Sequence, residues 1–126
     1  MMDVRMVNSL VLAYLGDSIY EEYVRCHLIK LGINKVNELQ EAAIRYVSAK
    51  RQAYYLDSLF DYNFFSLEEV EVIKRARNSK SHANPKGCGV IEYKKATGLE
   101  AIIGYWYLEK KYEKIEAMME EIFKIC

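Results

Sequence analysis

The chain has 126 residues, of which 52% are hydrophobic and 29% charged, with a single proline. This composition is too apolar for a disordered segment, and the length suits one domain spanning residues 1–126. Eighteen basic and eighteen acidic residues cancel, which argues against a protein whose entire surface attracts polyanions.

Neither the cysteines nor the N-terminus indicates an exported or membrane-bound protein. Cys26, Cys88 and Cys126 are odd in number and far apart, without a C-x-x-C motif or a nearby histidine pair, so reduced thiols are expected rather than disulfides or zinc. The first apolar run is interrupted by Asp17 and is too short for a signal peptide or a membrane span. We expect a cytoplasmic protein without membrane contact.

Apolar side chains recur at helical spacing from about residue 7 to residue 31, which predicts a first helix. Gly32 suits the C-terminal cap of this helix. Whether the helix breaks near Asn8 or Gly16 stays open. The same periodicity returns from Asn37, a good N-cap, to about Leu59, and predicts a second long helix.

A third helix is expected to begin near Leu67, because Ser66 and Glu69 have the spacing of a capping box. Residues 78–93 collect Asn, Ser, Gly and the only proline without periodicity, which indicates a long loop. From Lys94 onward the apolar residues return to helical register. No useful β-alternation appears, so the predicted fold class is all-α.

Two acidic residues stand where apolar residues are expected. Asp17 follows Gly16 within "LAYLGDSIYEEY", and Glu100 lies within "ATGLEAIIGYWYL", one turn from Ala96 and from Gly104. Helix faces lined by such small residues can approach each other closely. Two helices packed in this way would bring the two carboxylates together.

Carboxylates that share a site repel each other, and a hard divalent cation such as Mg²⁺ would neutralise them. Such an ion would activate water for attack on a phosphodiester. The ordinary alternative is that Asp17 caps a helix beginning after a break at Gly16, while Glu100 pairs with a lysine or arginine. The residue types alone do not separate these interpretations.

A basic segment accompanies the acidic pair. Between Lys74 and Lys95 there are seven basic residues and one acidic residue, Glu92. A loop this long in a compact domain is usually functional, and a basic one would hold a polyanion. The alternative is a solvated loop whose charges only aid solubility.

The two acidic motifs can be compared with those of known families. "LAYLGDSIYE" resembles the signature helix of ribonuclease III domains, and "TGLEAIIGYWYL" resembles their second acidic helix. "RYVSAKRQAYYL" and "RARNSKSHANPK" resemble middle segments of the Mini-ribonuclease III subfamily, which lacks the double-stranded RNA-binding domain. The likeness covers essentially the whole chain.

This resemblance implies a homodimeric, Mg²⁺-dependent endoribonuclease that cuts double-stranded RNA in stems flanking the 23S rRNA precursor. Asp17 and Glu100 would be its catalytic residues and metal ligands, and residues 12–23 would lie at or near the dimer interface. A ribosomal protein could present the substrate.

Only these two acids carry over directly from full-length ribonuclease III. Ala13 and Thr97 occupy the places of two further acidic residues, which weakens a strict two-metal interpretation. Thr97 could still orient water through its hydroxyl. Glu21, one turn after Asp17, could serve as an outer acid or merely pair with Arg25.

Without a second domain, the segment 75–95 is the candidate RNA-gripping element, because A-form RNA is recognised through phosphates and 2′-hydroxyls. His82 could act as a general acid or base, but a lone histidine in a loop more often contacts phosphate or has no role, so its part stays open. The candidate RNA-binding residues are Arg75, Arg77, Asn78, Lys80, His82, Lys86, Lys94 and Lys95.

The aromatic residues are expected to fill apolar space rather than to stack on single-stranded RNA. Tyrosines in apolar registers should lie in the core or at an interface, and Met118 and Met119 should fill the core. These tyrosines are Tyr14, Tyr46, Tyr54, Tyr105 and Tyr107.

Two other functions stay open at this stage. A catalytically silent double-stranded-RNA-binding dimer would have lost activity through Ala13 and Thr97. An all-α protein-interaction module would show no RNA affinity and no steep salt dependence.

Overall fold

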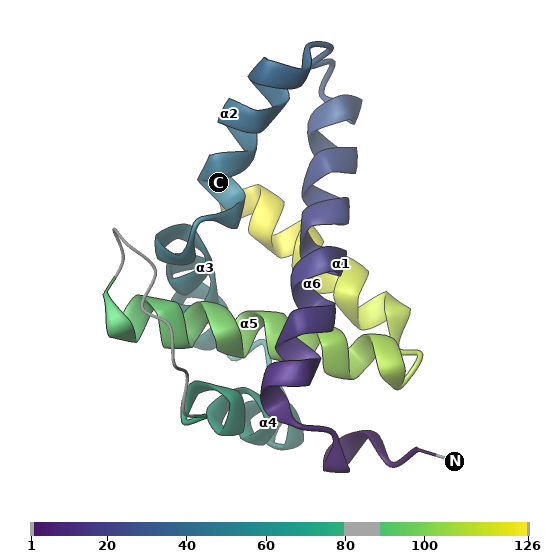
Figure 1. The fold of residues 1–126 in the computed structure, drawn as a ribbon, viewed down its shortest axis with the longest axis vertical. Helices are drawn as coiled ribbons and strands as arrows, with labels where there is room; N and C mark the ends of the chain where they lie inside the picture. Colours follow the sequence, from purple (N-terminus) through teal and green to yellow (C-terminus); the bar gives the residue numbers. More distant parts are fainter. Residues whose placement is uncertain (1, 80–88, 126) are drawn as a thin grey trace.

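The computed structural model describes residues 2–79 and 89–125, and this part of the chain is helical without any strand, so the all-α prediction is confirmed. The helices cross one another around a central α5 (Figure 1). In chain order they are η1 (Val4–Met6), α1 (Ser9–Lys30), α2 (Val36–Val47), α3 (Ala49–Asp61), α4 (Leu67–Arg77), α5 (Val90–Leu108) and α6 (Tyr112–Ile125).

Helix α5 forms the centre of the core and contacts α1, α3, α4 and α6. Its side chains are buried in every direction from Ala96 to Trp106, except for Glu100, which is half-buried. A helix that is apolar on all sides must be surrounded by other helices, and α5 is the helix on which the others pack. None of the described helices is both long and apolar enough to cross a membrane.

Helices α1 and α5 cross where both carry glycine. A Cβ atom on Gly16 would overlap the carbonyl oxygen of Glu100, and one on Gly104 would overlap the carbonyl oxygen of Leu12. The two backbones therefore touch directly, as the small-residue faces predict. Helix α1 continues through Gly16 without a break, so the interpretation of Asp17 as the cap of a new helix is wrong.

The predicted helix boundaries between residues 37 and 59 are also wrong. The single long helix expected from Asn37 to Leu59 is two helices, α2 and α3, separated at Ser48, whose hydroxyl accepts the backbone N–H of Arg51 and caps α3. Helix α2 begins after Lys35, so Asn37 lies inside it and is not its N-cap.

Helix α5 begins at Val90, four residues before Lys94, where the helical register was expected to resume. The carboxylate of Glu92 accepts the backbone N–H of Gly89 at 3.1 Å and satisfies one donor at the helix start.

Two other predicted helix ends are confirmed, that of α1 at Gly32 and that of α4 at Ser66. Gly32 has a positive φ of 98° directly after the α1 C-cap, a conformation that glycine adopts without strain. Ser66 and Glu69 form the reciprocal capping box at the start of α4. The carboxylate of Glu69 is buried and also accepts hydrogen bonds from Trp106 of α5 and Lys114 of α6.

The aromatic prediction is confirmed only in part. Tyr46 and Tyr105 are buried, as are Met118 and Met119. Tyr14, Tyr54 and Tyr107 are exposed, so they do not fill the core of this chain. Helical periodicity identifies a face of a helix but not whether another helix covers it, and these three tyrosines lie on uncovered faces.

The direct backbone contact makes a prediction about stability. Gly16→Ala and Gly104→Ala should each destabilise the fold by about 1–3 kcal/mol or more, since an added methyl group must push two helix backbones apart. Urea unfolding measures this loss. Gly98→Ala in α5 is the comparison, because its Cβ would lie 3.0 Å and 3.1 Å from side-chain atoms of Arg77 and Ile73 rather than overlap a backbone, so its loss of stability should be smaller. Wild-type stability of Gly16→Ala would contradict the close contact.

Candidate active site

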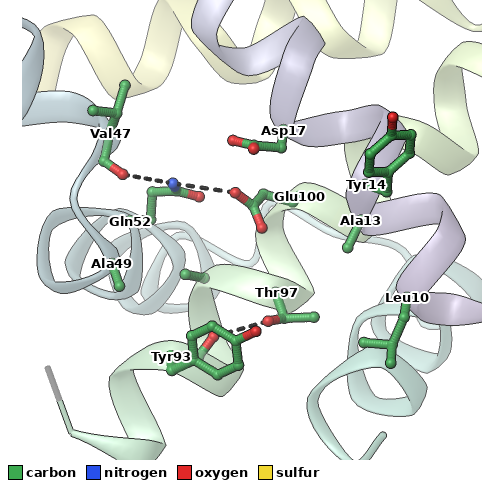
Figure 2. Close-up of a pocket in the computed structure, with 11 residues that line it drawn as sticks. Leu10, Ala13, Tyr14, Asp17, Val47, Ala49, Gln52, Tyr93, Thr97 and Glu100 are labelled. Atoms are coloured by element: carbon green, nitrogen blue, oxygen red, sulfur yellow. Dashed lines mark hydrogen bonds between the residues drawn. The ribbon is translucent and has the colours of Figure 1, made fainter. Parts of the chain in front are cut away.

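A pocket of about 460 Å³ opens where α1, α3 and α5 meet. Figure 2 shows Asp17 on α1 and Glu100 on α5 with their carboxylates toward each other, and Gln52 of α3 beside Glu100. The two acids are 83 positions apart in the chain. The contact between Gly16 and Glu100 brings them together, as the sequence predicts.

The carboxylate of Glu100 is held in an electrostatically unfavourable place. Burial, together with the charge and hydrogen-bonding contact of Asp17, raises its pKa from 4.5 to about 8. A weak hydrogen bond of 3.5 Å from Gln52 Nε2 to Glu100 Oε2 acts in the opposite direction. Glu100 makes no ion pair with a described lysine or arginine, so the alternative interpretation of this residue finds no support in the structure.

The places of the two missing family acids lie in the same pocket. Ala13 and Thr97 both line it, one turn before Asp17 and Glu100 respectively (Figure 2). The Thr97 hydroxyl donates a hydrogen bond to the Tyr93 carbonyl at 3.0 Å. Glu21 lies 3.7 Å from Arg25 in an exposed ion pair, which is the simpler of its two predicted roles.

Gln52 is the site residue that the sequence analysis missed. It is only 3% exposed, and its Oε1 accepts no hydrogen bond from any described residue. A signal was available: Gln52 lies on the same face of α3 as Leu56 and Leu59, which are fully buried, at the i, i+4, i+7 spacing of a core stripe. A glutamine in such a stripe needs a partner or a function.

This donor set fits a hard divalent cation. Among the described residues no group of three or more His, Cys, Asp or Glu side chains converges. Two carboxylates and one orphaned amide oxygen nevertheless suit Mg²⁺, which usually binds one or two carboxylates and retains several waters. Burial and the neighbouring charge of Asp17 raise the pKa of Glu100, and a bound cation would offset both effects by stabilising the ionised carboxylate.

The structure describes five of the eight predicted RNA-binding residues. Lys80, His82 and Lys86 lie outside the described residues. Lys94 and Asn78 are exposed, and Arg77 is half-buried.

The remaining two candidates have contacts within the chain. Arg75 donates hydrogen bonds to Ser9 and to the Arg5 carbonyl, and Lys95 forms an ion pair with Asp57 at 2.9 Å. Both side chains therefore also have a structural role.

The raised pKa of Glu100 predicts how stability depends on pH without divalent ions. Its pKa is higher in the folded than in the unfolded chain, so the folded state binds the extra proton and stability falls as the pH rises from 4.5 to about 8. The slope should approach about 1.4 kcal/mol per pH unit. Chemical unfolding at several pH values in EDTA measures it. The Glu100→Gln variant should show a flatter dependence of stability on pH. Glu41→Gln, at an exposed position of α2, should keep the wild-type dependence.

Comparison with known proteins identifies the family. The model of the ribonuclease III domain matches residues 10–111. The "Mini-ribonuclease 3" of Brevibacillus brevis is 46% identical over 123 residues, covering 98% of this chain and 90% of that protein. The protein of the same name from Staphylococcus aureus is 40% identical over 122 residues, covering 97% and 91%.

A solved structure has the same fold. The crystal structure of protein FN1578 from Fusobacterium nucleatum superposes with a TM-score of 0.88 at 37% identity, covering 98% of this chain and 99% of that one. The chain therefore belongs to the ribonuclease III domain family, in its Mini-ribonuclease 3 branch, and is an endoribonuclease, as its two acidic motifs predict.

Proposed function

We propose that this endoribonuclease cleaves double-stranded RNA and depends on Mg²⁺ held by Asp17 and Glu100. The observation that carries the proposal is the convergence of these two carboxylates in one pocket, where their charge is uncompensated. Family membership supports the substrate class, and the donor set supports the ion.

Each site residue has a distinct part in this proposal. Asp17 and Glu100 supply the negative charge that holds the cation, and the rigid contact of α1 with α5 fixes the distance between them. When bound, Mg²⁺ lowers the pKa of water for attack on the phosphodiester and stabilises the leaving oxygen. Thr97 lies in the pocket with its proton donated to Tyr93, so its oxygen lone pairs are left to orient water.

The basic segment 75–95 is proposed to hold the RNA backbone. Lys94 is exposed and directly follows Tyr93, which lines the pocket. Arg77 and Asn78 extend the surface from the end of α4. Lys80, His82 and Lys86 complete the proposed set. Arg75 and Lys95 would contact RNA phosphates in addition to Ser9 and Asp57, which they contact within the chain.

We further propose that residues 1–126 act as one catalytic domain in a cytoplasmic homodimer that matures the ends of the 23S rRNA precursor. Two sites related by a two-fold axis could cut both strands of one duplex. Val11 and Tyr14, which are 55% and 83% exposed on α1, offer the apolar surface that a second copy would cover. Presentation of the stem by a ribosomal protein would compensate for the small RNA-binding surface.

Cleavage of a labelled RNA duplex tests the proposal. Mg²⁺ should permit cuts on both strands and EDTA should prevent them. Asp17→Asn and Glu100→Gln should each reduce the rate by about 10³-fold, which corresponds to several kcal/mol of transition-state stabilisation. Duplex binding, measured in parallel, should persist. Duplex that is bound but never cut by the wild type would indicate a silenced site instead.

The salt dependence of duplex binding tests the basic segment separately. Lys94→Ala should weaken binding about equally for different duplex sequences and reduce the slope of log K against log salt by about 1. Lys30→Ala, which removes an exposed lysine at the far end of α1, is the matched control. An unchanged slope for Lys94→Ala would exclude Lys94 from the phosphate contacts.

A further inference from the structure

Gln52 is buried beside the acidic pair with an unpaired oxygen. Its Nε2 donates to the Val47 carbonyl at 3.0 Å and to Glu100 Oε2 at 3.5 Å. The Val47 carbonyl can only accept, so the opposite orientation of the amide would place Oε1 3.0 Å from another oxygen and can be excluded. The orphaned atom is therefore Oε1, and it belongs to a residue that lines the pocket.

An orphaned amide oxygen is costly for the fold. A buried acceptor without a hydrogen bond loses its hydration without compensation, and such groups are rare in native proteins. An apolar side chain of the same length would fill the space without this cost. When a bound cation keeps Asp17 and Glu100 ionised, neither can supply a proton donor, and no described residue donates to Oε1, so this oxygen is left for a donor that the described part of the chain does not contain.

The start of α3 fixes the position of this amide. The Gln52 backbone N–H donates to the Ser48 carbonyl at 2.9 Å, and the side chain reaches back to Val47. The backbone and the side chain of Gln52 therefore both donate hydrogen bonds to carbonyls at the junction of α2 and α3. The amide is placed with little freedom, as a residue that positions a ligand requires.

We propose that Gln52 is the third protein member of the cation site, with Oε1 accepting a hydrogen bond from the water shell of a divalent ion held by Asp17 and Glu100. It supplies, from α3, a neutral oxygen in a pocket where Ala13 and Thr97 offer no carboxylate. Its Nε2 meanwhile positions the Glu100 carboxylate. This inference rests on the proposed Mg²⁺ dependence and adds a residue that the acidic motifs do not contain.

Thermal unfolding during titration with MgCl₂, at constant ionic strength set with KCl, tests this role without measuring cleavage. The rise in Tm with ion concentration reports affinity for the folded state. Gln52→Met retains length and apolar volume but removes the amide. It should need about tenfold more Mg²⁺ than the wild type for the same shift, as is typical when an outer partner of a metal site is lost.

Gln40→Met is the matched control, because Gln40 is the only other glutamine and is exposed on α2. It should respond to Mg²⁺ like the wild type. Asp17→Asn should abolish the response. If Gln52→Met lowers Tm without Mg²⁺ but saturates at the wild-type concentration, Gln52 is only structural and the inference is overturned.

Gln52→Glu decides the question if Gln52→Met does not fold. It retains an acceptor oxygen, so Mg²⁺ should bind at least as tightly as in the wild type, and weaker binding would overturn the inference. A wild-type protein that shows no Mg²⁺ response would overturn the cation site itself, and with it the proposed function. Loss confined to Asp17→Asn, with both Gln52 variants unchanged, would remove only the role of Gln52.

Discussion

The direct backbone contact between α1 and α5 is the constraint on which the site depends. Gly16 and Gly104 each leave out a side chain where the other helix passes, so the two backbones touch at Glu100 and Leu12. Asp17 is adjacent to Gly16, and Glu100 is one turn before Gly104. Since helices are stiff, this single crossing determines where both carboxylates point. The rest of the core, formed around α5, holds the crossing in place.

This arrangement costs stability in order to bring like charges together. Burial and the nearby Asp17 raise the pKa of Glu100 to about 8, so at neutral pH the metal-free fold favours the protonated acid. A divalent cation would remove the repulsion and favour the ionised form. Buried acidic residues that lie next to a like charge concentrate at functional sites.

Glu69 and Glu100 show the difference between an acid with a structural role and the acid of the candidate site. Glu69 is buried, and its carboxylate accepts hydrogen bonds from the Ser66 backbone, the Trp106 indole and the Lys114 ammonium group. Glu100 receives, from the described residues, only the weak donation of Gln52. Glu69 is thus fully satisfied by the chain and ties α4 to α5 and α6. Glu100 and Gln52 are left with hydrogen-bonding capacity that no described residue uses.

The sequence by itself determined the helical class, the capping box of α4, the two acids and the small residues beside them, because helical period, caps and spacing are local properties. It did not determine that Ser48 divides α2 from α3, since apolar periodicity runs on through a short break. It also did not determine that Tyr14 and Tyr54 lie on uncovered faces while Tyr46 is covered. Only the tertiary structure placed Gln52 of α3 against Glu100 of α5, 48 positions away. Such a contact depends on how three helices cross, which no local pattern encodes.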